Sequence, residues 1–322
     1  MKSTIADYRQ KMCSFINALH STDRLFLIFW ACLSIAGIAL HSQTHYWPEI
    51  LAANGAAVAM VFAVAAAARR FPDSKALKIA HDWLAFPLVM FTYKQLYYII
   101  NPLHHGKDYD YLLAAIDRAI FGVNPTVWIS RLSHPIVTEA LQIAYSLFYV
   151  IFIAAGVELY RRKDSSEYGQ FRLAVVYGFM VSYIGYFFLP AVGPRLAIHD
   201  FSSINSELPG IFFTRHLRLF IDACESISPG ASNSLAIAQA QRDVFPSGHT
   251  MMTIIALAFA FRRKLKTRAL LMIIGTMLIV ATIYLRYHYV IDVITGALLA
   301  IFCLLTYRKI YFLLERKRRG EV

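Results

Sequence analysis

Cysteine is scarce in this sequence, which has four cysteines among 322 residues: Cys13, Cys32, Cys224 and Cys303. In the membrane topology derived below, Cys13 lies on the cytoplasmic side, Cys32 and Cys303 lie in membrane spans, and only Cys224 lies on the outer side. No disulfide framework is therefore implied. A cleavable signal peptide is not expected either. The first apolar run starts only at Leu25, and no small-residue cleavage site follows it cleanly.

Acidic residues are also few, at 20 against 32 Lys and Arg, which gives a net charge of +12. Nucleic acid is excluded as the partner behind this charge, because the basic residues cluster in short connections between apolar runs, as in membrane proteins. Hydrophobic residues make up 58% of the chain and the mean hydropathy is +0.49. Soluble domains are nearer 45–50% apolar. The composition therefore predicts an integral membrane protein, multi-pass and, in a bacterium, in the plasma or inner membrane.

The apolar runs predict an all-α membrane protein with about eight transmembrane helices, most of them near the roughly 20 residues that a bilayer requires. The predicted spans are 25–41, 50–68, 80–100, 136–159, 171–190, a short one at 249–262, 268–286 and 289–308. We expect residues 1–79 to form an N-terminal tail and two extra helices, 80–308 a six-helix catalytic domain, and 309–322 a basic cytoplasmic tail.

The distribution of Lys and Arg predicts the orientation of these helices. The connections 69–79, 160–170, 262–268 and 308–322 hold four, three, five and six of them. The connections 41–49, 101–135 and 192–247 hold none, three and four. Short connections rich in positive charge face the cytoplasm. We therefore expect both termini in the cytoplasm and the long connections outside.

Two outer segments stand out. Segment 109–131 is too polar to span, and a helical face of Leu112, Leu113, Ile116 and Ile120, with Asp110, Asp117 and Arg118 off that face, predicts a helix lying in the membrane interface. Gly122 can end this helix, and Asn124 with Pro125 can start another. The outer loop 192–247 is the longest connection, and loops of that length are usually functional or disordered.

The turn Val244-Phe245-Pro246-Ser247-Gly248-His249 opens onto an apolar helix. Ser247 is a preferred N-cap residue, and the first-turn N–H groups and the helix dipole attract an anion. Gly248 allows close approach of a ligand to the backbone, and His249 can exchange a proton near neutral pH. Alone, the turn is more often only a helix cap. Together with a second motif it predicts a phosphate-binding site with an acid/base group.

The second motif is His288 with Asp292, four residues apart and thus on one helix face. A carboxylate in that position can keep one ring nitrogen protonated and leave the other free to attack. Arg195, after the fifth span, and Arg286, after the seventh, lie at the same membrane level as Ser247 if the helices alternate. Ionisable residues at membrane boundaries are costly, which favours function over a purely structural hydrogen bond or an interfacial anchor.

These residues resemble the type 2 phosphatidic acid phosphatase superfamily, which shares its fold with the vanadium haloperoxidases. Pro246 to His249 is similar to its second motif, His288 with Asp292 to its third, and Arg195 to the arginine of its first. Asp117 and Arg118, with Phe121-Gly122 and Asn124-Pro125, resemble the branch that contains the inositol phosphorylceramide synthases. The resemblance covers roughly residues 80–308.

Three positions differ from the family pattern. Phe188 stands where the first motif has a lysine, and Pro194 precedes Arg195 where the usual order is arginine then proline. Thr282 stands where the third motif has an arginine six residues before its histidine. Arg286 is a candidate replacement for that arginine. Lys94, on another helix, is a candidate replacement for the lysine, although a lysine whose head group reaches to the interface is the more common arrangement.

The resemblance implies a phosphohistidine mechanism at an extracytoplasmic site. His288 is the nucleophile, Asp292 orients it, and His249 is the general acid and base. Ser247, Gly248, Arg195, Arg286 and Lys94 are the candidate phosphate ligands. Because arginines and a helix N-terminus stabilise the charge, we expect no metal and no cofactor; His104, His105 and His199 have no recognised ligand spacing and are interpreted as solvated loop histidines.

Three functional classes remain open. The favoured one is a lipid-phosphate phosphatase or phosphotransferase acting on a phospholipid or isoprenoid lipid phosphate; its alternative form is a head-group transferase, such as an inositolphosphotransferase, that moves a phospho-head group to a lipid hydroxyl. A haloperoxidase-like enzyme is less favoured, because it would require vanadate. A non-catalytic membrane scaffold or transporter is also less favoured, because transporters show paired half-helices and midplane charges.

Overall fold

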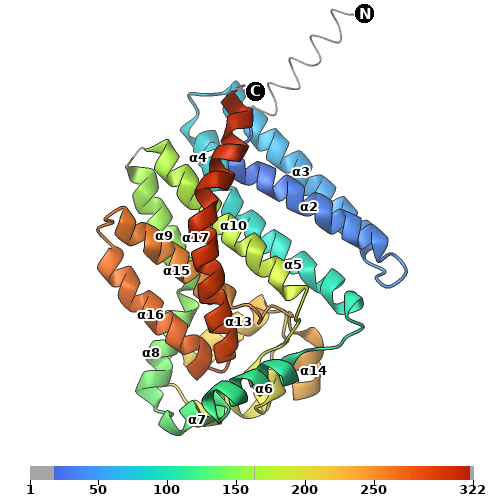
Figure 1. Ribbon diagram of the computed structural model, residues 1–322, viewed down its shortest axis with the longest axis vertical. Coiled ribbons are helices and arrows are strands. Elements are labelled where there is room, and N and C mark those ends of the chain that lie inside the picture. Colours follow the sequence, from blue (N-terminus) through green and yellow to red (C-terminus); the bar gives the residue numbers. More distant parts are fainter. Residues whose placement is uncertain (1–17, 163, 320–322) are drawn as a thin grey trace, which may run out of the picture. The chain divides into compact units, whose positions relative to one another are not determined.

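The computed structural model describes residues 18–162 and 164–319, and over these residues it contains helices and no strand. The chain divides into two compact units (Figure 1). Unit 1 comprises residues 1–103, 165–177 and 304–322, and unit 2 comprises residues 104–164 and 178–303. The predicted all-α class is confirmed. Cys13 and the first part of the predicted N-terminal tail lie outside the described residues.

Unit 1 contains α2 (Ser21–Ala39), α3 (Trp47–Arg70), α4 (Lys75–Trp83) and α5 (Ala85–Leu103). The helix α2 packs against α5 and α3, and each contact includes a hydrogen bond between side chains. The Trp30 indole N–H donates to the Thr92 hydroxyl at 2.9 Å, and the Asn54 amide donates to the Ser34 hydroxyl at 2.9 Å. The helix α5, which the sequence assigned to the segment 80–308, falls in this unit.

Unit 2 carries most of the remaining elements. They are α6 (Asp110–Phe121), α7 (Pro125–Ile129), η1 (Ser130–Leu132), α8 (Pro135–Ser146), α9 (Phe148–Arg161), α11 (Pro194–Ala197), η2 (Phe201–Ser203), α12 (Ile204–Glu207), α13 (Thr214–Cys224), α14 (Asn233–Gln239), α15 (Gly248–Arg262) and α16 (Arg268–Tyr284). Two longer helices, α10 (Ser165–Tyr186) and α17 (Val290–Arg319), contribute residues to both units.

The segment 192–247 is folded rather than irregular. It contains four short α-helices, and its buried apolar side chains join those of α8 and α16 in one cluster. That cluster includes Leu141, Tyr145, Ile204, Leu208, Ile221, Tyr284 and Tyr287. Because α13 and α12 share a core with α8 and α16, the segment is a fixed part of unit 2.

Fewer helices have the length and composition of a membrane span than the sequence suggested. Within the described residues, α2, α3 and α17 are long and apolar enough to cross a membrane. Two bent helix pairs, α6 with α7–η1 and α8 with α9, raise the number to five if each pair is one span. The helices α15 and α16 are apolar but short, with 15 and 17 residues. Every predicted apolar run is helical, but the eight spans are not confirmed.

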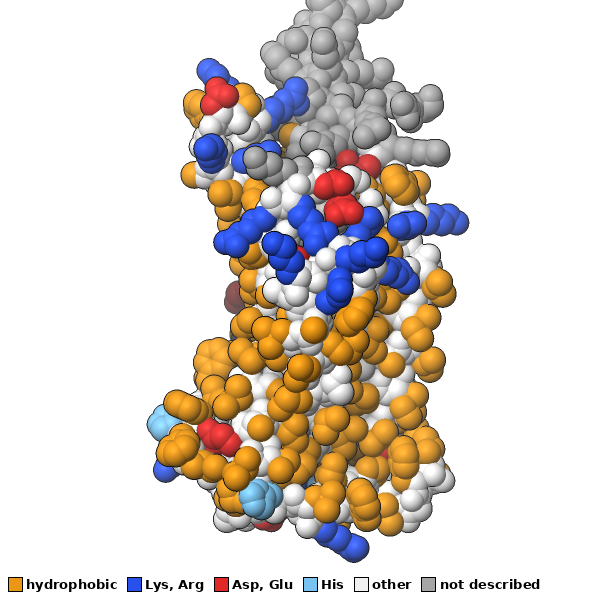
Figure 2. All heavy atoms as spheres, turned by 90° about the vertical axis from the view of Figure 1, so that its left-hand side faces the viewer, with side chains coloured by type: hydrophobic (Ala, Val, Ile, Leu, Met, Phe, Trp, Pro, Cys, Tyr) orange, Lys and Arg blue, Asp and Glu red, His pale blue; other side chains and the backbone are white. Residues whose placement is uncertain are grey.

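Two of the basic connections lie side by side in unit 2. The Arg162 guanidinium, after α9, donates to the carbonyls of Arg263 at 2.6 Å and Lys264 at 3.2 Å, between α15 and α16. Glu158 on α9 accepts from the Lys266 backbone N–H at 2.6 Å. Figure 2 shows the resulting pattern over α9, α15 and α16: a hydrophobic surface bordered by a band of Lys and Arg. This pattern supports an integral membrane protein.

The helix α6 buries a polar face besides its apolar one. Asp110 and Asp117 are buried together with Leu113 and Ala114, at 6% and 1% exposure for the two carboxylates. Ile120, from the predicted apolar face, is 54% exposed. The sequence did not predict that the two carboxylates are buried. Backbone N–H groups of neighbouring loops satisfy them, as described below.

Candidate active site

The first part of the site is the N-terminus of α15. The Ser247 hydroxyl accepts from the Thr250 backbone N–H at 3.3 Å, as an N-cap does. The Ser247 backbone N–H donates to the Asp292 carbonyl at 3.0 Å, which joins this turn to the start of α17. Gly296 on α17 packs against Ser247, because an added Cβ there would lie 2.6 Å from the Ser247 carbonyl oxygen. The two predicted motifs are thus in direct contact.

Two histidine rings face each other beside this turn. His288 Nε2 lies 3.3 Å from His249 Nδ1. On the other side of its ring, His288 Nδ1 lies 3.0 Å from the Val244 carbonyl oxygen and 3.5 Å from Asp292 Oδ2. A carbonyl oxygen only accepts, so Nδ1 of neutral His288 carries the proton and Nε2 is the free nitrogen. The group that fixes this tautomer at the shorter distance is the Val244 backbone, which sequence reasoning did not identify.

Asp292 has a second contact besides His288. Its Oδ2 accepts from the Tyr289 backbone N–H at 2.8 Å, at the start of α17, while Oδ1 is buried with no hydrogen-bond partner among the described residues. The carboxylate therefore also fixes the turn that carries His288. Burial lowers the pKa of His288 to about 4, against the opposing charge of Asp243. At neutral pH, His288 is therefore an uncharged imidazole.

Aromatic rings enclose the other histidine. The Tyr145 ring stacks on His249 with centroids 4.6 Å apart, and Phe148 lies at 4.3 Å. Tyr145 also stacks on Tyr287 at 4.2 Å. The sequence predicted a single helix over 136–159, but α8 and α9 meet at a 50° bend at Leu147. This bend brings Tyr145 and Phe148, from either side of it, to the histidine, and no sequence signal marked it.

The loop that carries Arg195 packs closely against the loop that carries His288. The Arg195 backbone N–H donates to the Arg286 carbonyl at 2.8 Å. Gly193 has a φ of 92°, and a Cβ there would lie 2.7 Å from the Tyr287 carbonyl oxygen. A glycine is required because the backbone is left-handed and the neighbouring backbone is too close for any side chain.

Both candidate arginines bind carboxylates of the segment 192–247. Arg195 is buried and forms ion pairs with Asp222 at 2.6 Å and with Glu225 at 2.5 Å. Arg286 is buried, forms an ion pair with Glu207, and has an Nε with no hydrogen-bond partner among the described residues. Desolvation raises the pKa of Glu225 to about 7, partly offset by the charge of Arg195. The sequence pointed to the arginines and did not predict their carboxylate partners.

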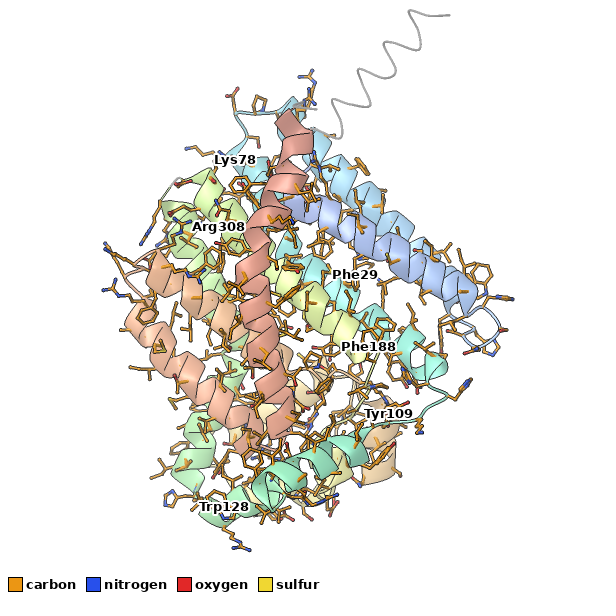
Figure 3. All side chains as sticks on the ribbon, viewed as in Figure 1. Phe29, Lys78, Tyr109, Trp128, Phe188 and Arg308 are labelled. Carbon is orange, nitrogen blue, oxygen red and sulfur yellow. The ribbon has the colours of Figure 1, made fainter. Side chains whose placement is uncertain are left out.

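The remaining predicted residues lie elsewhere. Lys94 is on α5 in unit 1, so its role as a phosphate ligand stays a prediction. Phe188 follows α10 and is 70% exposed (Figure 3). Thr282 has a structural role in the loop that carries His288, because its backbone carbonyl accepts from the backbone N–H groups of Tyr287 and His288, both at 2.9 Å.

The loop histidines are not simply solvated. His104 Nε2 lies 2.8 Å from the Phe187 carbonyl oxygen, and His199 Nε2 lies 3.1 Å from the Thr126 hydroxyl. Burial and the charge of Arg286 lower the pKa of His199 to about 4. Of these residues, only His105 is exposed. Within the described residues, no group of three or more His, Cys, Asp or Glu side chains is arranged to hold a metal ion.

Over the described residues, the structure combines apolar helices with two facing histidines at the N-terminus of α15. Comparison with protein families matches residues 112–306 to the PAP2 superfamily, and the chain belongs to this superfamily. The match begins within α6 and covers most of unit 2, together with residues 165–177 and 304–306 of unit 1.

A relative in Dictyostelium discoideum is called a PA-phosphatase related-family protein. It is 29% identical over 202 residues, which is 57% of this chain and 33% of the relative. The chain therefore spans about a third of the length of the relative that it matches. No solved structure matches the chain significantly.

Proposed function

We propose that this protein transfers the phosphoryl group of a membrane lipid phosphate through a phosphohistidine at His288. The observation that carries the proposal is the position of the His288 ring. Nδ1 is held by the Val244 carbonyl, which leaves Nε2 as the free nitrogen, and that nitrogen faces His249 at 3.3 Å. A nucleophile fixed by one group and facing an acid/base partner is the arrangement that nucleophilic catalysis needs.

In the first step, His288 Nε2 attacks phosphorus and the bond from phosphorus to the leaving oxygen breaks. The proton of His249 goes to that oxygen. In the second step, water or an alcohol gives a proton to His249 and its oxygen attacks phosphorus, and the phosphorus–nitrogen bond breaks. Substrate entry separates the two rings. The backbone N–H groups of Gly248 and His249 at the start of α15 hold the equatorial oxygens, and Asp292 with Val244 stabilises the imidazolium.

The arginines complete the phosphate site by exchanging partners. The phosphate oxygens replace part of the contact that Arg195 makes with Asp222 and Glu225. They also accept from the Nε–H of Arg286, which has no hydrogen-bond partner among the described residues. Arginine suits this exchange because its planar guanidinium has five N–H donors. No catalytic metal is invoked, since the N–H donors of these guanidinium groups and of the helix N-terminus can bind the phosphate oxygens.

One observation favours the transferase form of this activity. The acidic side chains Asp222, Glu225 and Glu207 neutralise the arginines, so the site carries little net positive charge. A phosphate monoester has a charge of about −1.5 to −2 at pH 7, and a phosphodiester has only one negative charge. A phosphodiester donor, with an alcohol as acceptor, fits this charge balance better. The second candidate is therefore a head-group transferase of the inositol phosphorylceramide synthase type.

The first experiment uses purified protein in detergent with ³²P-labelled phosphatidic acid, with and without EDTA. Release of phosphate and an acid-labile label on the protein are expected, and neither should change with EDTA. His288→Ala should abolish both, whereas the matched control His105→Ala, at an exposed histidine, should leave both unchanged. If His288→Ala retains activity, the assignment of the nucleophile is wrong.

A parallel assay separates the two forms of the activity. The donor is phosphatidylinositol labelled in its head group, and a lipid alcohol is the acceptor. Label that appears in the acceptor lipid and not in water-soluble product identifies a transferase. Release of phosphate from phosphatidic acid with no labelled acceptor product from phosphatidylinositol identifies a phosphatase.

We also propose that the site faces the extracytoplasmic side, with both termini in the cytoplasm. In unit 2 the basic connections after α9 and α15 lie together, and the histidine site is built on the opposite ends of α15 and α16. A membrane-impermeant thiol reagent tests this in intact cells, with a cysteine introduced at the exposed Ser234 of α14 and the wild-type chain as the control for its own cysteines. Additional labelling of Ser234→Cys from outside is expected. Protection of that position in intact cells, combined with labelling after lysis, would reverse the orientation.

A further inference from the structure

Two carboxylates on one face of α6 account for the way the active-site loops are held. Asp110 and Asp117 are seven residues apart, which is two helical turns, so they point to the same side. Both side chains are buried. Figure 1 shows α6 running across the end of unit 2 where α17 begins. Neither residue belongs to the three motifs that contain Arg195, His249 and His288.

Asp110 connects the two loops of the site. Its Oδ2 accepts from the Val192 backbone N–H at 3.0 Å, and its Oδ1 accepts from the Gly193 backbone N–H at 2.8 Å. The same Oδ1 accepts from the Tyr289 hydroxyl at 3.0 Å. One carboxylate therefore binds the backbone two residues before Arg195 and the side chain next to His288.

Asp117 holds the start of α17. Its Oδ2 accepts from the Val290 backbone N–H at 2.8 Å, and its Oδ1 accepts from the Ile291 backbone N–H at 2.9 Å. These N–H groups belong to the first turn of the helix and have no intrahelical acceptor. Since the Tyr289 backbone N–H donates to Asp292, three successive backbone N–H groups after His288 are bound by two carboxylates.

A carboxylate is required at both positions for a geometric reason. Each aspartate uses both of its oxygens to accept from two adjacent backbone N–H groups. An asparagine has one accepting oxygen, and its amide N–H₂ would face an N–H donor. Arg118, the neighbouring cation on α6, instead donates to the Asn124 side chain at 3.2 Å.

We propose that Asp110 and Asp117 are positioning residues that set the geometry of the catalytic loops, Asp117 for the nucleophile His288 and Asp110 for both His288 and Arg195. This inference rests on the proposed function, because it assigns roles through those two residues. It predicts a division of effects. Loss of Asp117 changes the chemical step, and loss of Asp110 changes both the chemical step and the binding of phosphate.

The experiment compares Asp117→Asn, Asp110→Asn and Tyr289→Phe with the matched control Asp73→Asn, at an exposed loop aspartate. The measurements are kcat, KM and the inhibition constant for inorganic phosphate. Displacement of a reacting group by about 1 Å can cost a hundredfold in rate. We expect kcat to fall by about tenfold to a hundredfold in Asp117→Asn, with the inhibition constant within about twofold of wild type. In Asp110→Asn both values should change, and in Tyr289→Phe only kcat should fall.

A merely structural role predicts a different result. The melting temperature and the active fraction would then fall while KM and the inhibition constant for phosphate stayed the same in both aspartate variants, and this would overturn the proposal. Asp117→Glu keeps the carboxylate and should recover part of the kcat lost in Asp117→Asn. Equal loss in the two Asp117 variants, with both folded, would also overturn it.

Amide hydrogen exchange separates this proposal from the proposed function. Exchange at Val192 and Gly193 should accelerate in Asp110→Asn, and exchange at Val290 and Ile291 should accelerate in Asp117→Asn, whether or not the substrate is known. If wild-type protein is inactive on every donor and these changes occur, the proposed function fails and the contacts stand. Unchanged exchange in both variants refutes the positioning contacts themselves.

Discussion

Gly248 is the first residue of α15 and one of the candidate phosphate ligands, and its surroundings allow a sharp test. A Cβ added there would lie 2.8 Å from the Tyr186 hydroxyl oxygen and 3.5 Å from the Ser182 hydroxyl oxygen. The first distance is too short for any carbon–oxygen contact. Tyr186 is 4% exposed, so its ring cannot swing into open space. The Gly248→Ala variant therefore has to move either Tyr186 or the start of α15.

Two opposing effects set the magnitude. Alanine is the better helix former by up to about 1 kcal/mol, whereas insertion of a methyl group into a packed site costs about 1–3 kcal/mol. The packing term is larger, so we expect a net loss of about 1 kcal/mol of stability. The turn also holds the phosphate, and a displaced helix start should reduce kcat/KM by about tenfold or more.

The double variant Gly248→Ala/Tyr186→Phe identifies the cause. Removal of the hydroxyl leaves the Ser182 contact at 3.5 Å, an ordinary van der Waals distance. Most of the lost activity and stability should therefore return. The assay is kcat/KM and melting temperature for wild type, the two single variants and the double variant. Wild-type activity of Gly248→Ala, or no recovery in the double variant, would refute this geometry.

Three further predictions concern single residues. Burial lowers the pKa of His288 to about 4, so kcat/KM, corrected for substrate ionisation, should stay constant down to pH 5. An ordinary histidine would be only about 3% neutral at that pH. A fall of kcat/KM below pH 6.5 would show that the ring is hydrated. The unfolded chain binds the extra proton, so the contribution of His288 to stability should be lost as the pH falls from 6.5 towards 4. Desolvation raises the pKa of Glu225 to about 7, so its negative charge opposes the binding of phosphate at pH 8 but not at pH 6. Glu225→Gln should therefore bind inorganic phosphate several-fold more tightly than wild type at pH 8 and about equally at pH 6. The same ratio of the two dissociation constants at both pH values would contradict this. Glu139 on α8 accepts from the backbone N–H groups of Ile211 at 2.8 Å and Phe213 at 2.6 Å, and hydrogen bonds to a charged group contribute about 1.5–3 kcal/mol. Glu139→Gln should therefore lower the melting temperature by several degrees, whereas Glu49→Gln, at an exposed glutamate, should not. Equal melting temperatures for the two variants would show that Glu139 does not stabilise this loop.

Local patterns in the sequence determined the helical class, the family and the two histidine motifs. Apolar runs of roughly 20 residues leave few alternatives to a helix in a membrane. Ser247 as a cap and the four-residue spacing of His288 and Asp292 are local features, which a helix converts directly into geometry.

Tertiary structure decided which groups these residues contact. His288 is held by the carbonyl of Val244, 44 positions earlier, and Asp117 binds the backbone 173 positions later. A backbone carbonyl or N–H is present at every position, so no residue type marks these partners in advance. The ion pairs of Arg195 with Asp222 and Glu225 depend on the packing of the segment 192–247 against α8 and α16. The bend at Leu147 could not be predicted either, because no proline or glycine marks it in the sequence. Such contacts depend on how helices that are distant in sequence pack against each other, and local sequence patterns do not contain that information.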